Sequence, residues 1–124
     1  ANQQTLLRAI WDKEVGEGHG KRVIFFGFSQ GVATISRFAA FSKIPFDSLV
    51  LWSGGFPPDI PSGSFAHLKG HETVHYLTGN DDPYYKPEMR YTQTDLVKLA
   101  MGKEPTTTFF DGGHTVVPEL LNTI

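Results

Sequence analysis

One stretch of this chain restricts its possible folds more than any other: an apolar run that leads directly into a G-x-S-x-G turn. The run is Val-Ile-Phe-Phe at residues 23–26, and the turn is Gly-Phe-Ser-Gln-Gly at residues 27–31. Apolar residues then return at helical spacing, at positions 32, 35, 38 and 39. The stretch therefore predicts a strand buried on both faces, a tight turn and a helix in direct succession.

The rest of the chain repeats this alternation of apolar runs and helical patterns. Three more strands are expected at 49–52, 73–78 and 106–110, and two more helices at about 87–101 and 117–124. In the helix at 87–101, we expect Leu96, Leu99 and Ala100 to face inward and Gly102 to end the helix. One more helix face is predicted near the N-terminus by Leu6, Leu7, Ile10 and Trp11. Strands that alternate with helices form a parallel sheet flanked by helices, so the predicted fold class is α/β.

Length and composition narrow the functional classes. The 124 residues suffice for a single domain, 1–124, and 40% of them are hydrophobic. There is no cysteine, which excludes disulfides and thiolate metal sites and fits a reducing, cytoplasmic setting. The net charge is −2 with no basic block, and the longest apolar runs are too short to cross a bilayer. We therefore expect no nucleic-acid partner and no membrane span.

The turn at residues 27–31 is typical of a nucleophile site. Ser29 is expected on a strained backbone between strand and helix, so that its hydroxyl points out above the sheet. Gly27 and Gly31 are expected at positions where a Cβ would clash with neighbouring backbone. The helix that follows directs free N–H groups toward the same point, so the N–H of Gln30 is the predicted oxyanion donor.

A serine nucleophile needs a base, and the base needs a carboxylate to orient it. Loops at the carboxyl ends of parallel strands meet at one edge of the sheet. Asp81 and Asp82 follow the strand at 73–78, and His114 follows the strand at 106–110. Their order after Ser29 is the order that this type of site requires, although spacing alone leaves both aspartates open. The other histidines do not follow a predicted strand: His19, His67, His71 and His75.

Several motifs, in order, resemble the phospholipase/carboxylesterase family of α/β-hydrolases, which includes the acyl-protein thioesterases. They are G-F-S-Q-G at 27–31, L-W-S-G at 51–54 with Pro57, G-N-D-D-P at 79–83, G-G-H at 112–114, and Pro118-Glu119. The resemblance covers nearly all of the chain. It implies an α/β-hydrolase-like sheet and a serine hydrolase that cleaves small acyl esters or thioesters, with no metal and no cofactor.

The same resemblance selects Asp82 rather than Asp81 as the acid, because the family motif is G-x-x-D-P. The expected catalytic triad, with an acyl-enzyme on its serine, is Ser29, Asp82 and His114. Three aromatic side chains are candidates for lining a substrate pocket beside it: Phe28, Phe56 and Tyr84. The family usually has Val shortly after the acid, where this chain has Tyr84 and Tyr85, and this difference predicts a narrower or reshaped pocket.

Family members also begin with several strands and an L-H-G-x-G loop that supplies a second oxyanion donor. That region precedes the motifs found here, so we expect residues 1–124 to be the C-terminal portion of a longer hydrolase, with the N-terminal strands missing. The strand at 23–26 would then leave an apolar sheet edge open, which favours self-association. With one oxyanion donor absent, we expect the 124 residues alone to be weakly active or inactive.

Two alternatives to a serine hydrolase remain open. One is a zinc metallopeptidase, because residues 71–75 read H-E-T-V-H and match the H-E-x-x-H pattern. That pattern needs a helix, whereas Thr73 and Val74 favour a strand, on which residues four apart are separated by about 13 Å. The other is a non-catalytic remnant or interaction module of the same fold.

Overall fold

The structure of the chain, a computed structural model, describes residues 22–124. Its elements follow in the order β1 (Ile24–Phe28), α2 (Gly31–Phe41), β2 (Ser48–Trp52), β3 (Thr73–Gly79), η2 (Pro87–Met89), α3 (Arg90–Met101), β4 (Thr106–Phe110) and α4 (Pro118–Leu121). Each of the four predicted strands is present within two residues of its expected bounds. The helix predicted from Leu6, Leu7, Ile10 and Trp11 lies outside the described residues.

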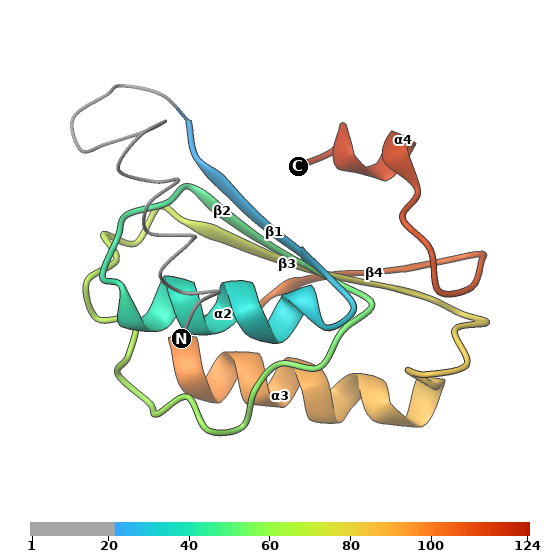
Figure 1. Cartoon of the computed structure of the whole chain (residues 1–124), viewed down its shortest axis with the longest axis horizontal. Coiled ribbons are helices and arrows are strands. Elements are labelled where there is room, and N and C mark those ends of the chain that lie inside the picture. The colour runs from blue at the N-terminus through green and yellow to red at the C-terminus, as the bar shows by residue number, and fades with distance from the viewer. Residues whose placement is uncertain (1–21) are drawn as a thin grey trace.

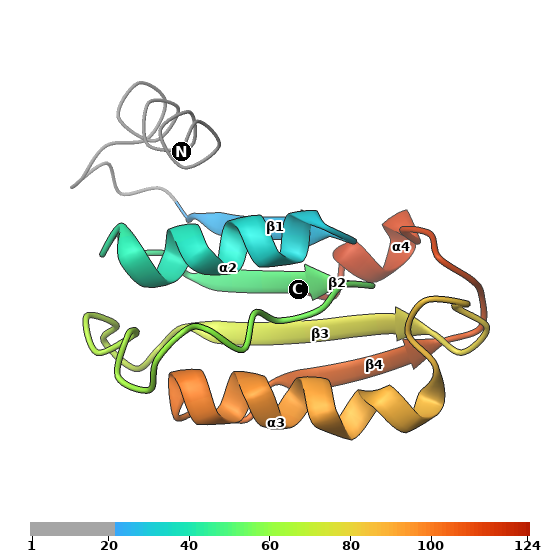
Figure 2. The same ribbon diagram turned by 60° about the horizontal axis from the view of Figure 1, so that its bottom comes forward.

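The four strands form one parallel sheet in the order β1-β2-β3-β4. Helix α2 connects β1 to β2 and α3 connects β3 to β4, as parallel neighbours require. All four strands therefore end at the same edge of the sheet, at the right in Figure 2. At that edge Phe28 pairs with Trp52, and Trp52 pairs with Leu77. This arrangement confirms the predicted α/β class.

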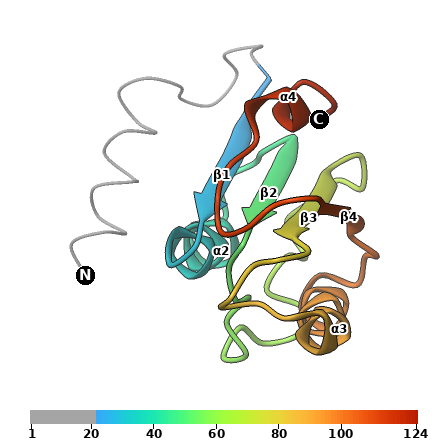
Figure 3. The same cartoon turned by 90° about the vertical axis from the view of Figure 1, so that its right-hand side faces the viewer.

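Both faces of the sheet carry apolar side chains, because successive residues of a strand point to opposite faces. Helices α2 and α3 cover one face, and the short α4 lies against the other (Figures 1 and 3). The larger core, under α2 and α3, includes Phe25, Val32, Ile35, Phe38, Leu49, Leu51, Val74, Tyr76 and Val97. The smaller core, under α4, is built on Val50, Trp52, Leu77 and Phe110. Within residues 22–124, no helix combines the length and apolar character needed to span a bilayer.

The prediction that the first strand is buried on both faces is wrong for the described part of the chain. Phe25 faces α2 and is 8% exposed, but Ile24 and Phe26 on the other face are 46% and 40% exposed. β1 is an edge strand, and the residue of β1 that packs in the core under α4 is Phe28, at the end of the strand. A continuous apolar run indicates burial on two faces only when neighbouring elements cover both.

Helix α3 ends as expected but faces the sheet with a different residue. Gly102 adopts a left-handed conformation with φ of 69°, and its N–H donates to the carbonyl of Lys98, which closes the last turn. Val97 and Ala100 are buried, whereas Leu99 is 71% exposed and does not face inward as predicted. Residues 97 and 100 share one helix face, and residue 99 falls about 100° away from Ala100 around the helix.

Candidate active site

Ser29 lies in the turn between β1 and α2, and its backbone is strained. Its φ is 57°, a left-handed value that few non-glycine residues adopt. The Ser29 N–H donates to the Trp52 carbonyl at 2.9 Å, and its own carbonyl accepts from Val32 N–H at 3.1 Å. These bonds hold the turn at the end of β1, where the predicted nucleophile was expected. Gln30 directly precedes helix α2, where backbone N–H groups have no partner within the helix.

Gly27 and Gly31, the two glycines of the turn, differ in whether a larger side chain would fit. A Cβ at Gly27 would lie 2.5 Å from the carbonyl oxygen of Gly31, so the expected clash is confirmed there. The same expectation for Gly31 is wrong, because a Cβ at that position would meet nothing within 4 Å. The reason is that Gly31 borders an open hollow instead of packed backbone.

The loops after β3 and β4 bring Asp82 and His114 to Ser29. His114 Nδ1 lies 2.9 Å from Asp82 Oδ2, and His114 Nε2 lies 3.0 Å from Ser29 Oγ. The three side chains therefore form a continuous chain of hydrogen bonds although 85 residues separate Ser29 from His114. Asp81, the other aspartate that spacing allowed, is exposed and donates its backbone N–H to the Gly112 carbonyl.

Asp82 is enclosed by donors. It is 2% exposed, and its Oδ1 accepts the backbone N–H groups of Tyr84 at 2.8 Å and Tyr85 at 3.3 Å. Burial by itself would raise the pKa of Asp82, but the bonds from His114, Tyr84 and Tyr85 outweigh burial and hold that pKa below its ordinary value. Asp82 is therefore ionised at neutral pH and can orient the His114 ring.

Two further glycines, which belong to the L-W-S-G and G-N-D-D-P motifs but had no predicted role of their own, let the site close. A Cβ at Gly54 would collide with the Ser29 carbonyl and the Val32 side chain. A Cβ at Gly79 would collide with the carbonyls of Gly112 and Gly113. Both glycines stand at or just beyond the end of a strand, β2 or β3, which is the signal that could have identified them. They allow the His114 loop and the Ser29 turn to approach the sheet edge closely.

Aromatic rings surround His114. The Phe28 and Tyr84 rings lie 4.9 Å and 4.8 Å from the His114 ring, and the Tyr85 ring stacks at 6.5 Å. Tyr84 is 66% exposed, so it borders the site from the solvent side. Phe56, the third residue predicted to line a pocket, is instead a core residue with 2% exposed. Phe28 and Tyr84 are thus beside the site, and Phe56 packs beneath α2 and α3.

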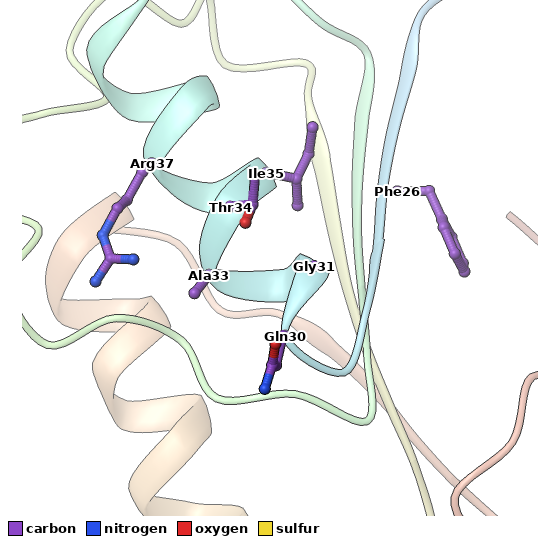
Figure 4. A pocket seen from close by; sticks show the side chains of 7 residues that line it. All are labelled: Phe26, Gln30, Gly31, Ala33, Thr34, Ile35 and Arg37. Atoms are coloured by element: carbon purple, nitrogen blue, oxygen red, sulfur yellow. The ribbon is translucent and has the colours of Figure 1, made fainter. Parts of the chain in front are cut away.

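A hollow of about 460 Å³ opens beside Gln30, along the outer side of α2. Figure 4 shows Gln30 at the start of α2 and Arg37 further along the helix; Phe26 of β1 also lines the hollow, and its side chain points away from α2. Arg37 pairs with Asp59 at 3.0 Å, so its charge is already matched. The hollow is open to solvent and adjoins the predicted oxyanion donor.

The other histidines of the described region lie away from Ser29. His71 precedes β3 and contacts Asp47 at 3.0 Å, and His75 lies within β3 and contacts Thr73 Oγ1 at 3.1 Å. The H-E-x-x-H segment thus enters a strand and does not form the helix that a zinc peptidase needs. Within residues 22–124, no group of three or more His, Cys, Asp or Glu side chains could hold a metal ion. His19 lies outside the described residues.

The comparisons with known proteins add evidence on the fold. No family model and no curated protein matches the sequence. Among solved structures, acyl-protein thioesterase 2 of Zea mays is similar, with a TM-score of 0.73 and 16% identity over 98% of this chain and 61% of that one. A variant of Arabidopsis thaliana SOBER1 gives 0.68 and 22% over 97% and 59%. An esterase of Pyrococcus furiosus gives 0.64 and 16% over 98% and 56%.

These similarities define the fold class: the described chain has the fold of an α/β-hydrolase. The structures that share this fold include esterases and thioesterases. The chain spans between 56% and 61% of the length of the three proteins named above. At this low sequence identity, structural similarity shows the fold only, and the reaction has to be argued from the residues of the site.

Proposed function

We propose that this chain carries the active site of a serine hydrolase that cleaves carboxylic esters or thioesters. One observation supports the proposal most directly: the unbroken hydrogen-bond chain from Asp82 through His114 to the hydroxyl of Ser29. A buried carboxylate, an imidazole and a hydroxyl on a strained turn are the three groups that acyl transfer to serine requires.

In the proposed reaction, Ser29 Oγ attacks the acyl carbon while its proton passes to Nε2 of His114. Asp82, bonded to Nδ1, holds the ring and stabilises the imidazolium that forms. His114 then gives the proton to the departing alcohol or thiol, which leaves an acyl group on Ser29. A water molecule, deprotonated by His114, attacks that acyl group, and His114 then returns the proton to Ser29 Oγ as the acid leaves.

The negative charge that develops on the acyl oxygen needs donors that are already in place. In this proposal the Gln30 N–H supplies one, because it stands at the start of α2 beside Ser29. Phe28 and Tyr84 would border the acyl group, since both rings contact the His114 ring. Their positions favour small acyl groups, because Tyr84 narrows the approach from solvent.

A fluorophosphonate probe tests the proposal, since it labels a serine only when a base activates the hydroxyl. We expect labelling at Ser29, identified by peptide mass spectrometry, and its loss in Ser29→Ala and in His114→Ala. Hydrolysis of p-nitrophenyl acetate should disappear in the same two variants. His75→Ala is a matched control, because His75 contacts Thr73 and lies away from Ser29.

A folded wild-type chain that takes up no probe would contradict the proposal. Circular dichroism and a cooperative unfolding transition would establish that the chain is folded. In that case the non-catalytic interaction module would be the better description of residues 22–124.

A further inference from the structure

Trp52, a residue that the proposed reaction does not use, connects the Ser29 turn to the His114 loop. It is the last residue of β2 and is fully buried. Its backbone carbonyl accepts the N–H of Ser29 at 2.9 Å. Its indole Nε1–H donates to the carbonyl of Thr115, also at 2.9 Å. A single residue is thus bonded to the nucleophile turn and to the residue that follows the base.

The sheet order explains why such a connection is needed. Ser29 follows β1 and His114 follows β4, and these are the two outermost strands of the four-stranded sheet. The segment after β4 must therefore cross the ends of β3 and β2 before its histidine can reach Ser29 (Figure 3). Trp52 stands at the end of β2, on the path of that crossing.

The loop around the histidine combines two glycines with one short internal bond, from the Thr115 N–H to the Gly113 carbonyl at 3.0 Å. Gly112 and Gly113 directly precede His114, and glycine leaves the backbone the most conformations to lose. The Asp81 N–H donates to the Gly112 carbonyl at 2.9 Å, which fixes the loop on the side of Asp82. The indole of Trp52 fixes it on the side of Ser29. The two bonds thus lie on either side of His114, both of whose ring nitrogens are at hydrogen-bond distance from a partner.

We propose that Trp52 is a positioning residue that sets the contact between Ser29 Oγ and His114 Nε2. Its ring also packs against Phe110, with centroids 5.6 Å apart, so the indole N–H is held in direction as well as position. The role rests on the proposed serine hydrolase function. Trp52 does not touch the reacting atoms, and it acts through the backbone of Thr115.

Trp52→Phe separates the bond from the packing, because it keeps an aromatic ring and the backbone carbonyl but removes the N–H. We expect the rate constant for phosphonylation of Ser29, and kcat for ester hydrolysis, to fall about tenfold. The probe concentration at half-saturation and KM should not change, since no contact to the substrate is lost. Phe46→Leu is the control: it removes a ring contact with Phe25 in the core under α2 and α3, away from the indole of Trp52, and should lower stability with the rate constant unchanged.

Hydrogen exchange of the indole N–H tests, without any reaction, the bond from Trp52 Nε1–H to the Thr115 carbonyl, which we call the tether. The sequence has two tryptophans, so the indole that disappears from the spectrum in Trp52→Phe identifies the Trp52 signal in ¹⁵N-labelled protein. We expect the Trp52 Nε1–H to exchange with D₂O far more slowly than a free indole. The protection should persist in Ser29→Ala, where no chemistry is possible.

The two measurements fail in different ways. A Trp52 N–H that exchanges like a free indole would overturn the tether, whatever the activity. Full phosphonylation rate in Trp52→Phe would overturn the positioning role while leaving the serine hydrolase intact. A wild-type chain that is never labelled would remove the proposed reaction and this role with it, even if the indole were protected.

Discussion

Within residues 22–124, two aspartate–histidine pairs of nearly equal length lie at opposite ends of the sheet. At the carboxyl end, Asp82 lies 2.9 Å from His114, and at the amino end Asp47 lies 3.0 Å from His71. The surroundings differ. The side chains of the first pair are 0% and 20% exposed, and those of the second are 33% and 57% exposed, in the same order. The distance within a pair therefore does not reveal what the pair does.

The two pairs differ in the group that the second ring nitrogen of the histidine contacts. His114 reaches a serine hydroxyl, whereas the second ring nitrogen of His71 faces the carboxylate of Glu72 at 3.6 Å. Asp47 also accepts the Val23 N–H at 2.7 Å, and its carbonyl accepts the Thr73 N–H at 3.0 Å. The amino-end pair thus joins the starts of β1, β2 and β3. Its groups join neighbouring strands, and those of the carboxyl end are arranged around the Ser29 hydroxyl.

The largest expected effect comes from deleting one histidine of each pair. His114→Ala should lower kcat/KM for a short acyl ester to the level of the uncatalysed reaction, however weak the wild-type activity is, because the proposed base is lost. His71→Ala should leave kcat/KM unchanged, since His71 lies at the other end of the sheet. Steady-state hydrolysis of p-nitrophenyl acetate measures both. Equal losses in the two variants would mean that the two ends do not differ in function.

A smaller effect is expected from adding one methyl group beside Ser29. Gly54→Ala should lower the free energy of unfolding by about 1–3 kcal/mol, because the new Cβ collides with the Ser29 carbonyl. Gly31→Ala is the control, where the Cβ meets nothing within 4 Å and should raise stability by about 0.5–1 kcal/mol. Urea denaturation followed by circular dichroism would compare them. Equal tolerance of both changes would contradict the close packing around the turn.

Asp82 and Asp47 should also differ in how much they make the free energy of unfolding depend on pH. The pKa of Asp82 is held below the ordinary 3.8 by hydrogen bonds that outweigh burial, and the pKa of Asp47 is lowered mainly by the bond from the Val23 N–H. A lowered folded-state pKa adds stability above the unfolded-state value, and this stability is lost as the pH falls through the folded-state value. The loss of unfolding free energy between pH 7 and pH 3 should thus be smaller in Asp82→Asn than in wild type.

Asp47→Asn should reduce the same loss by less, because the Asp47 carboxylate is more exposed to solvent and its interactions are screened. Urea denaturation at a series of pH values measures each variant against wild type. A larger reduction in Asp47→Asn than in Asp82→Asn would reverse the order that we infer for the two ends.

The smallest expected effect is on self-association through the two outermost strands, β1 and β4. Ile24 and Phe26 expose apolar surface on β1, which favours association at high protein concentration. Phe26→Lys should shift sedimentation profiles toward the monomer. Phe109→Lys on the opposite edge strand, where Phe109 is 37% exposed, is the matched control with a weaker shift. Identical profiles of Phe26→Lys and wild type at high concentration would exclude β1 as the associating edge.

Local patterns were enough to predict most of the fold and the residues of the proposed site. The four strands, the helix at 31–41 and the cap at Gly102 each follow from residues adjacent in sequence. The placement of Asp82 and His114 near Ser29 followed from one rule, that parallel strands end at a common edge. Asp82 could be chosen over Asp81 only through a family motif, since both residues occupy the same turn.

Three of the errors of prediction share one cause. Burial of Ile24 and Phe26, the outward direction of Leu99 and the core position of Phe56 depend on which elements cover each face. Hydrophobic pattern reports the residues that prefer to be buried, but it does not report the neighbours that bury them.

The sequence by itself determined the strand, turn and helix around Ser29 and the α/β class, because these follow from patterns among residues that are near neighbours in the chain. The tertiary structure alone decided that β1 and β4 are the outer strands, that Gly54 and Gly79 stand against loop carbonyls, and that Trp52 joins the Ser29 turn to the His114 loop. These features require segments far apart in the chain to come into register, and register is set by packing across the sheet.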